Sequence, residues 1–488
     1  MTLHESFDLR AQLRDPALFV EAALINGEWR ARADMAVMNP ATGDVLGHMP
    51  DNTAAETEEA IAAAAEAMKS WKAKTHAERA DILMAWYDLM LENADDLALI
   101  LTAEQGKPLA EAKGEIVYGA SFLRWFAEEA RRINGHIIPS PVKGKKIFAM
   151  KEPVGVCAII TPWNFPTAMI TRKVAPGLAA GCTMVIKPSD FTPYSALALC
   201  LLGERAGIPA GVLNCLTGRP EAIGGALTAS PVVRKLSFTG STRVGALLAQ
   251  QCAPTLKKLS LELGGNAPFI VFDDADLDAA VEGAMASKFR NGGQTCVCAN
   301  RLLVQSGIHD AFVARLTEKV DALKVGPGTA EDTTIGPMIN SAAIDKINRH
   351  IEDALSKGAT RATKKRALSG QYADPTVLVG ATLDMQCAGE ETFGPVAPVF
   401  KFETEEEALE IANGTPFGLA AYFYTTDMAR AFRFGEALET GLVGLNTGAV
   451  SHAEAPFGGV KASGLGREGA QEGIEEYLET KAFHFGGL

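Results

Sequence analysis

The run Val154-Gly-Val-Cys-Ala-Ile-Ile160 begins a change of pattern, from helical periodicity to short apolar stretches. Three more stretches of this kind follow, at Thr183–Lys187, Val212–Leu216 and Lys235–Thr239, and helical segments such as Pro193–Ala206 separate them. Short β-rich runs that alternate with helices predict parallel strands with helices on both faces of the sheet. Such a sheet binds nucleotides beyond the carboxyl ends of its strands. The sequence therefore predicts an α/β fold with a nucleotide site.

A glycine-containing segment directly follows the last of these strands. In Gly240-Ser-Thr-Arg-Val-Gly245, the free N–H groups at a helix start would favour a pyrophosphate. A second segment, Gly464-Leu-Gly-Arg-Glu-Gly469, fits the dinucleotide pattern G-x-G-x-x-G. No convincing strand precedes it, and the chain ends before an acidic partner could follow at the usual distance. We therefore place the predicted phosphate site at 240–245.

Cys296 is the candidate nucleophile, within 286–301, Ala-Ser-Lys-Phe-Arg-Asn-Gly-Gly-Gln-Thr-Cys-Val-Cys-Ala-Asn-Arg. Gly292 and Gly293 break the predicted helix Leu277–Phe289 just before it, so the chain can turn sharply and present a thiol in a cleft. A free cysteine is usually a small buried hydrophobe. Here the neighbours are glycine, glutamine, threonine and asparagine, which make poor core material.

Glu262 is the candidate base, within the apolar run Leu259-Ser-Leu-Glu-Leu-Gly-Gly-Asn-Ala-Pro268. Apolar surroundings raise the pKa of a carboxylate towards neutrality, which suits a general base. A buried ion-pair partner is the alternative interpretation. Beyond Glu262, strands near Phe269–Phe272, Leu302–Val304 and Pro398–Phe402 predict a second α/β domain that carries the thiol.

The rest of the chain gives local signals. Capping boxes, Thr53 with Glu56 and Thr75 with Glu78, predict the starts of two helices. Residues 1–50 are predicted to be irregular, with a turn at Asn26-Gly27 among others. A third helix is predicted from about Leu109 to Ile133. Ile147–Lys151 and Leu478–Phe485 alternate like strands, which predicts surface hairpins.

Composition limits the possible functions. At 488 residues the chain is too long for one hydrophobic core. Its net charge of -13 argues against a nucleic-acid partner and against an anionic membrane surface. No apolar run is long enough to span a bilayer. The eight histidines show no H-E-x-x-H pattern, and Cys296 with Cys298 is not a ligand set, so no metal is expected.

Location is predicted from the cysteines and the first residues. Eight scattered cysteines form no disulfide framework and fit a reducing compartment. With Glu5, Asp8 and Asp15, the N-terminal segment resembles neither a secretory signal nor a transit peptide. We therefore expect a cytoplasmic protein.

Several motifs together make the chain resemble the aldehyde dehydrogenase superfamily from about Leu24 to Leu488, and within it the succinate-semialdehyde dehydrogenases. They occur in the family's order: Thr161-Pro-Trp-Asn-Phe-Pro166, Lys187-Pro-Ser189, Phe238-Thr-Gly-Ser-Thr242, Leu261-Glu-Leu-Gly-Gly265, Gly293-Gln-Thr-Cys296, Glu391-Thr-Phe-Gly-Pro395 and Pro456-Phe-Gly-Gly459. The resemblance implies a Rossmann-type NAD(P)-binding domain (1–130 and 150–260), a catalytic domain (261–470) and oligomerisation segments (131–149 and 471–488). It also implies a homodimer or homotetramer.

The family's chemistry then assigns the catalytic roles. Cys296 would attack an aldehyde carbon and give a thiohemiacetal. The side-chain amide of Asn164, with the Cys296 N–H, would bind the developing oxyanion. Hydride transfer to the cofactor would leave a thioester, and Glu262 would activate the water that hydrolyses it.

The resemblance also implies the residues that bind the cofactor, NAD with NADP as a possibility. An acid at Asp190 can accept from both ribose hydroxyls and would repel a 2′-phosphate, which favours NAD. Lys187 would hold the adenosine ribose and Ser241 a phosphate. The complete implied set is Trp163, Lys187, Ser189, Asp190, Gly240, Ser241, Gly245, Glu391 and Phe393.

Substrate specificity is implied by Arg172 and Arg290, which match arginines that hold a substrate carboxylate, and by Ser451, which matches an assisting hydroxyl. Arginine's planar fork suits bidentate carboxylate binding. An ion pair that braces the domains is the alternative for each arginine. The leading substrate is succinate semialdehyde; glutarate semialdehyde or another aldehyde is the alternative. From another class, a non-catalytic structural protein would have no reason to retain this set of residues.

Cys298, two residues beyond the nucleophile, has two interpretations. A buried spacer is the default. Alternatively, its thiol captures a sulfenic acid formed on Cys296, which would give a redox-sensitive disulfide. The family resemblance favours this second role.

Overall fold

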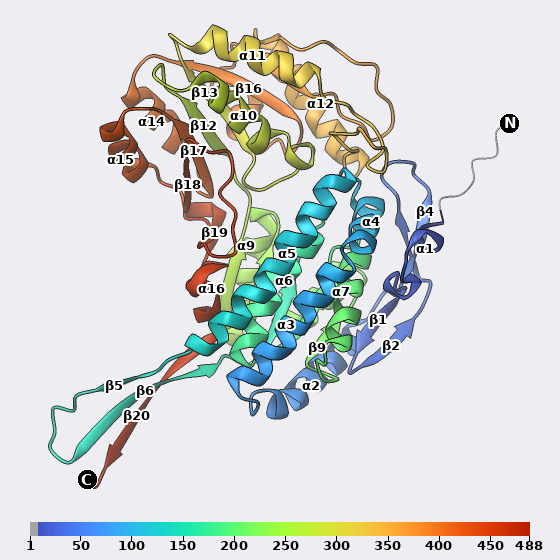
Figure 1. The fold of residues 1–488 in the computed structure, drawn as a ribbon, viewed down its shortest axis with the longest axis vertical. Helices are drawn as coiled ribbons and strands as arrows, with labels where there is room; N and C mark the ends of the chain where they lie inside the picture. The colour runs from blue at the N-terminus through green and yellow to red at the C-terminus, as the bar shows by residue number, and fades with distance from the viewer. Residues whose placement is uncertain (1–7) are drawn as a thin grey trace.

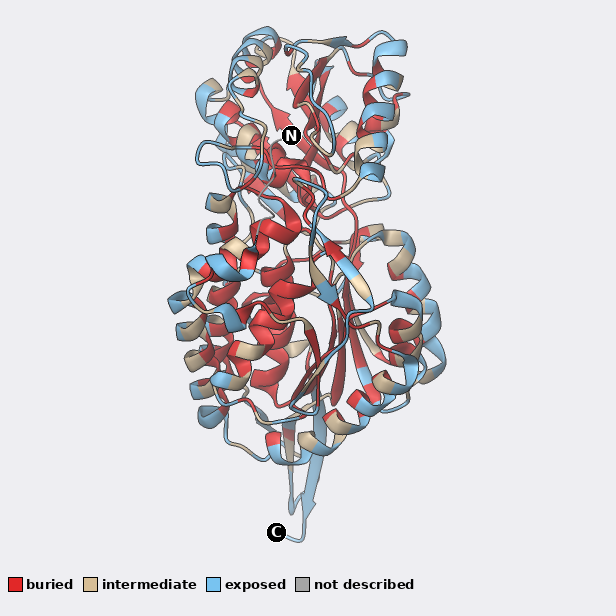
Figure 2. Ribbon diagram, turned by 90° about the vertical axis from the view of Figure 1, so that its right-hand side faces the viewer, coloured by how far each residue is buried: buried red, intermediate tan, exposed pale blue. Residues whose placement is uncertain are grey.

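The computed structural model describes residues 8–488, which form two α/β lobes and a projecting arm of strands (Figure 1). Buried residues are concentrated in the sheets and inner helices of the lobes, whereas the arm is largely exposed (Figure 2). Among the described residues, no helix combines the length and apolarity that a membrane crossing needs.

The first lobe contains an eight-stranded sheet in the order β19-β11-β10-β7-β8-β9-β1-β2. Its five central strands are parallel. Four of them agree with the predicted strands: β7 (Val156–Ile160), β8 (Thr183–Lys187), β9 (Leu213–Cys215) and β10 (Val233–Thr239). The fifth, β11 (Lys258–Glu262), lies in the apolar run that carries Glu262. Antiparallel strands complete both edges: β19 (Gly464–Leu465) on one side, β1 (Ala22–Ile25) and β2 (Glu28–Ala31) on the other. The strand order reverses at β7, which lies between β8 and β10.

Helices cover both faces of this sheet, because successive residues of β7 point to opposite sides. Cys157 and Ile159 belong to one core, and Val156 and Ala158 belong to the other. The first core contains α3 (His76–Glu92), α4 (Ala94–Gln105), α5 (Leu109–Glu129), α6 (Pro166–Ala180) and α7 (Pro193–Arg205). The second contains α2 (Ala54–Trp71), α8 (Pro220–Ala229) and α9 (Thr242–Cys252). Both predicted capping boxes are confirmed, at the starts of α2 and α3.

The second lobe contains a seven-stranded sheet in the order β14-β15-β16-β13-β12-β17-β18. All are parallel except the short edge strand β14 (Thr360–Arg361): β12 (Ala267–Val271), β13 (Ala299–Gln305), β15 (Thr376–Val379), β16 (Val396–Phe402), β17 (Ala420–Tyr424) and β18 (Leu442–Leu445). One face packs against α10 (Leu277–Lys288) and α11 (His309–Asp321). The other packs against α12 (Ser341–Ser356), α14 (Glu405–Asn413) and α15 (Met428–Ala437). The predicted second α/β unit is therefore present.

The arm is a three-stranded antiparallel sheet, β20-β6-β5, formed by β5 (His136–Ile138), β6 (Lys145–Pro153) and β20 (Leu478–Gly486). It confirms the two predicted strand-like segments. The chain reaches β20 through the short helix α16 (Ala470–Glu475).

One sequence prediction is wrong over its described part. Within the predicted irregular stretch 1–50, the described residues 8–50 contain α1 (Leu9–Gln12), β1, β2, β3 (Met35–Met38) and β4 (Val45–Met49). The predicted turn is present, since Asn26 and Gly27, with φ of 56° and 76°, join β1 to β2. These strands escaped prediction because β1 pairs with the distant β9, where Leu24 lies opposite Cys215. The predicted domain limits stay predictions, although β19, from the 261–470 stretch, lies in the first sheet.

Candidate active site

Cys296 lies at the end of the segment 290–296, here called the thiol loop. Asn291, Gly292 and Gly293 have φ of 51°, 61° and 77°, so three successive residues adopt the left-handed conformation after α10. A Cβ on Gly293 would lie 2.3 Å from the Gly394 carbonyl oxygen, and this close approach requires glycine. The predicted sharp turn before the thiol is confirmed.

Two cavities meet at Cys296. The first, here called the glycine-side cavity, has a volume of about 260 Å³. The second, here called the arginine-side cavity, is narrow, with a volume of about 30 Å³. Cys296 is half-buried and lines both of them. A group bound in one cavity therefore faces the same sulfur as a group bound in the other.

The glycine-side cavity lies where the strand order of the first sheet reverses. Trp163 and Asn164 follow β7, and Gly240 and Ser241 follow β10. Ser241 caps the helix α9, and its Oγ accepts the Val244 N–H at 3.4 Å. This is the position at which a doubly wound sheet binds a nucleotide.

Two glycines make the phosphate end of this site compact. A Cβ on Gly240 would lie 2.4 Å from the ring of Phe238, and one on Gly245 would lie 2.3 Å from Leu263. The backbone before α9 can therefore be approached closely, and the N–H groups at the helix start suit a pyrophosphate. The residues present fit a dinucleotide.

The opposite wall comes from the second lobe. Glu391 accepts the Gly265 N–H at 3.2 Å, and burial raises the pKa of its carboxyl to about 7. Lys346 of α12 donates to the Glu391 carbonyl oxygen and lines the cavity. Phe393 has a left-handed φ of 56°, and its ring makes an edge contact with Trp163 at 5.6 Å. Lys346 had no distinguishing signal in the sequence.

Lys187, Ser189 and Asp190 lie at the carboxyl end of β8 and do not line the glycine-side cavity. Gly245, in α9, does not line it either. Lys187 Nζ donates to Asp190 Oδ1 at 2.7 Å and to the Pro188 carbonyl at 3.0 Å. Burial raises the pKa of Asp190, and the charge of Lys187 opposes this effect. These residues share the sheet edge that carries Gly240.

The arginine-side cavity brings together all three predicted substrate residues. Arg172, Arg290 and Ser451 line it with Cys296, and so does Tyr118 of α5, which the sequence did not single out. The wall is completed by Phe165, Ala168, Met169, Thr295, Val297 and Phe457. Aromatic and apolar walls around two guanidinium groups suit a short anion.

The two arginines differ in their partners. Arg172 is buried, forms an ion pair with Glu468, and lies 4.2 Å from the centre of the Phe457 ring. Arg290 is exposed and lies 5.3 Å from the Phe165 ring. No carboxylate of residues 8–488 is within ion-pair distance of it. The ion-pair alternative therefore applies to Arg172, whereas Arg290 makes no direct ion pair within residues 8–488.

Glu262 is the last residue of β11 and is only 2% exposed. Within residues 8–488, neither of its carboxylate oxygens has a hydrogen-bond partner. Burial raises its pKa well above the usual range, and the charge of Glu468 adds to this effect. The structure thus contains the buried carboxyl that a general base requires, without the direct ion pair of the alternative interpretation.

Asn164 and Cys296 complete the centre. Asn164 Nδ2 donates to the Gln294 carbonyl at 3.1 Å, which uses one N–H of its amide and leaves the second. Burial raises the pKa of the Cys296 thiol to about 12, while the charge of Arg172 lowers it. The thiol therefore holds its proton at neutral pH in this arrangement.

Cys298 lies away from both cavities. Its buried sulfur accepts from Lys288 Nζ at 3.3 Å, and burial raises its pKa. The disulfide with Cys296 stays a prediction.

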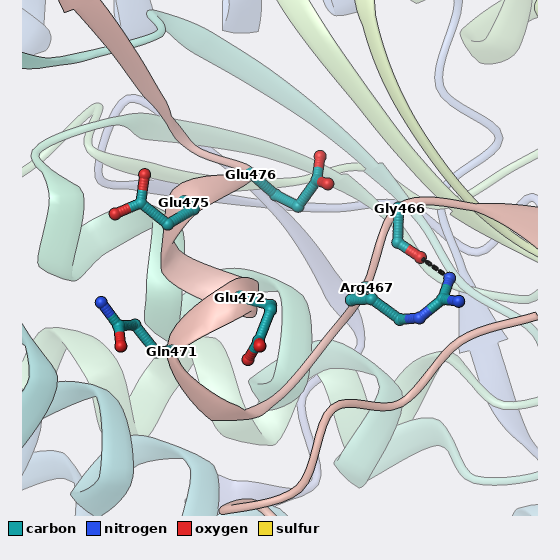
Figure 3. A pocket seen from close by; sticks show the side chains of 6 residues that line it. All are labelled: Gly466, Arg467, Gln471, Glu472, Glu475 and Glu476. Carbon is teal, nitrogen blue, oxygen red and sulfur yellow. Dashed lines mark hydrogen bonds between the residues drawn. The ribbon is translucent and has the colours of Figure 1, made fainter. Parts of the chain in front are cut away.

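A separate cavity of about 470 Å³ lies beside α16 (Figure 3). Three glutamates line it, and Arg467 donates to the Gly466 carbonyl at 2.7 Å. None of the predicted site residues is among its lining.

Comparison with known proteins gives a family and close relatives. A model described as "Aldehyde dehydrogenase family" matches residues 29–483. A glutarate-semialdehyde dehydrogenase of Pseudomonas putida is 58% identical, over 96% of this chain and 98% of the relative. The NADP(+) succinate-semialdehyde dehydrogenase GabD of Escherichia coli is 57% identical, over 96% and 98%. The crystal structure of succinate-semialdehyde dehydrogenase from Burkholderia pseudomallei is 58% identical, with a TM-score of 0.96 over 98% of this chain and 100% of that one.

Proposed function

Because this chain belongs to the aldehyde dehydrogenase family, we propose that it oxidises a short acidic semialdehyde, foremost succinate semialdehyde, to the diacid with NAD(P). The observation that carries the substrate proposal is the presence of Arg172 and Arg290 in the cavity that also contains Cys296. A carboxylate held by the arginines would place an aldehyde a few carbons away at the sulfur. Glutarate semialdehyde is the alternative, since a relative named for it is equally similar.

The reaction begins at the thiol. The Cys296 thiol releases its proton to water, the thiolate sulfur bonds to the aldehyde carbon, and the carbonyl oxygen takes the π electrons and becomes an oxyanion. The second N–H of the Asn164 amide and the Cys296 N–H donate to this oxygen. One such donor contributes on the order of 3 kcal/mol to transition-state stabilisation.

When bound, the nicotinamide cofactor supplies the acceptor for the hydride of the thiohemiacetal carbon. Ser241 and the start of α9 would hold its pyrophosphate. Lys187 and Asp190 would bind its adenosine ribose, and Glu391 would bind its nicotinamide ribose. The carboxylate of Asp190 would accept from the ribose hydroxyls and repel a 2′-phosphate, which favours NAD over NADP. NADP remains the alternative, because the Escherichia coli relative is named for it.

Hydrolysis then frees the sulfur. Glu262 takes a proton from water, the hydroxide adds to the thioester carbon, and the carbon–sulfur bond breaks to release the acid and the Cys296 thiolate. The raised pKa of Glu262 makes its carboxylate a stronger base than an exposed glutamate.

Assembly and location belong to the same proposal. The arm leaves the edges of β5 and β20 free, which supports pairing with a second copy in a homodimer or homotetramer. The scattered free cysteines support a cytoplasmic location, and the acidic net charge argues against a nucleic-acid partner and an anionic membrane surface.

The substrate is tested by NADH and NADPH formation with succinate semialdehyde, glutarate semialdehyde and propionaldehyde. Arg290→Ala should lower kcat/KM about 10- to 150-fold for the acidic substrates, since charge-assisted bonds contribute roughly 1.5–3 kcal/mol. The value for propionaldehyde should change little. Arg172→Ala should show the same pattern with an added loss of stability, because it leaves Glu468 without its arginine partner. An equal loss on all three aldehydes would give Arg290 a structural role and remove the acid-binding proposal.

A further inference from the structure

Lys107 is a buried lysine just behind the candidate active site, outside the lining of both cavities. Only 2% of it is exposed. Its Nζ donates to Glu115 Oε2 at 2.5 Å and to the main-chain oxygen of Asn164 at 2.8 Å. It also lies 3.9 Å from the centre of the Phe165 ring. The lysine thus ties helix α5 to the loop that carries Asn164.

Two carboxylates of α5, one helical turn apart, accept hydrogen bonds from the two segments that flank Cys296 and Asn164. Glu115 Oε1 accepts the N–H groups of Thr167 and Ala168, at 3.0 and 3.3 Å, in the first turn of α6. Glu111 Oε2 accepts the N–H of Asn291, at the start of the thiol loop, at 2.8 Å. The start of α6, which directly follows the loop that carries Asn164, and the thiol loop are therefore anchored on the same helix.

The two loops are also bonded directly to each other. Asn291 Nδ2 donates to the Asn164 carbonyl at 3.0 Å and to the Gln294 carbonyl at 3.3 Å. The Gln294 carbonyl also accepts the Asn164 amide at 3.1 Å. The Asn164 carbonyl, in turn, accepts from both Lys107 and Asn291. Lys107 is therefore bonded to the main chain of Asn164, the residue whose side-chain amide lines the same cavity as Cys296.

A purely structural role for the pair is the competing explanation. A buried ion pair is costly to desolvate, however, and well-packed apolar residues often stabilise a fold as much or more. We propose that Lys107 and Glu115 are positioning residues, which fix the Asn164 amide against the thiol loop so that its second N–H meets the thiohemiacetal oxygen. This inference rests on the proposed function, because that oxygen forms only in the aldehyde reaction.

The test compares Lys107→Met, Glu115→Gln and the double variant K107M/E115L with the wild type. Lys235→Met is the matched control, since Lys235 is also buried, donates to Ser260 Oγ at 2.5 Å and pairs with Glu476, but among the described residues it makes no hydrogen bond to Asn164 or to the thiol loop. Four quantities are measured: the rate constant and the amplitude of the NADH burst, the cofactor Kd, and the thermal midpoint. Alkylation of Cys296 by iodoacetamide counts the reactive thiols independently of turnover.

We expect Lys107→Met to lower the burst rate constant about 10- to 100-fold, the size of a small misplacement of a catalytic group. Burst amplitude, thiol count and cofactor Kd should stay within about twofold of the wild type. Glu115→Gln should show a smaller loss of the same kind. The double variant should regain thermal stability without regaining the burst rate, and Lys235→Met should lose stability alone.

Recovery of both stability and burst rate in the double variant would overturn the inference. So would an unchanged rate constant with a reduced amplitude, because that describes fewer folded sites. The same comparison with propionaldehyde separates this inference from the substrate proposal. If the wild type oxidises only the uncharged aldehyde, the acidic substrate is wrong, and the positioning role is decided by the variants on propionaldehyde.

Discussion

Loss of hydration raises the pKa of two groups, the buried carboxyl of Glu262 and the half-buried thiol of Cys296. Both shifts disfavour the charged form in which each group acts. Arg172 opposes both shifts, and Glu468, its ion-pair partner, raises the pKa of Glu262. The pKa values of Glu262 and Cys296 therefore depend on the charges of the ion pair between Arg172 and Glu468.

The role of Glu262 can be isolated by Glu262→Gln, which preserves shape but cannot take a proton from water. We expect acylation to continue and thioester hydrolysis to slow by about 100-fold or more, within the range of general base catalysis. Rapid mixing should show a full burst of NADH followed by slow turnover. Cys296→Ala is the control and should show no burst. Equal slowing of burst and turnover in Glu262→Gln would assign the base to another group.

The sequence predicted residue types well but not their partners. The sequence predicts both Arg172 and Arg290 beside the substrate. It does not show that Arg172 forms an ion pair with Glu468, because Glu468 is far away along the chain. Tyr118 is one of many aromatic residues in a helical pattern, so its place in the arginine-side cavity had no local signal. The Lys107–Asn164 contact joins distant segments and depends on the packing of α5 against α6.

At the scale of elements, one helix caps another through a buried carboxyl. Glu104, near the end of α4, accepts the N–H groups of Tyr194 and Ser195, each at 2.8 Å, at the start of α7. Thr192, the N-cap residue of α7, makes no side-chain cap. Burial raises the pKa of Glu104 to about 8 from its usual 4.5. The start of α7 therefore depends on a group that changes charge near neutral pH.

This predicts a pH-dependent stability. Between pH 4.5 and 8, folded Glu104 keeps the proton that the unfolded chain releases, so its contribution to stability is complete at low pH and falls as the pH rises. The expected slope is roughly 1.4 kcal/mol per pH unit within this window. In Glu104→Gln the thermal midpoint should depend less on pH between 5 and 8, whereas exposed Glu58→Gln should follow the wild type. Parallel profiles for all three proteins would remove this assignment.

Elements that are stabilised by nearby residues could be predicted from the sequence, whereas elements that are stabilised by distant residues could not. The capping boxes at Thr53 and Thr75 were correct because each involves a residue three positions away. The strands of residues 22–49 were not predicted, since β1 is stabilised by β9, a strand far along the chain. The parallel strands around Cys157 were predictable because burial on both faces makes their sequences continuously apolar.

At the scale of the whole molecule, the arm has no core of its own. β6 and β20 pair over nine positions, from Leu478 opposite Pro153 to Gly486 opposite Lys145, yet most of their residues are exposed. Phe483 and Phe485 remain 47% and 45% exposed. Exposed aromatic side chains on a sheet with free edges are typical of a surface that pairs with another chain.

Removal of residues 480–488 should therefore reduce the mass of the assembly, measured by sedimentation velocity, while each lobe stays folded. Phe483→Asp should weaken the assembly in the same direction, because it places a charge on the apolar face of the arm. Lys481→Ala, which breaks only the exposed ion pair with Glu152, is the control and should assemble as the wild type. An unchanged mass after truncation would place the interface elsewhere.

The position of Cys296 between two cavities has a consequence for the timing of the catalytic cycle. Since the sulfur belongs to both walls, an acyl group attached to it can occupy the arginine-side cavity while the glycine-side cavity stays open to solvent. Among the described residues, Cys296 is the one residue that lines both cavities. A dinucleotide in one cavity and an acyl group in the other would therefore share no other wall, which would let the dinucleotide leave before the acid.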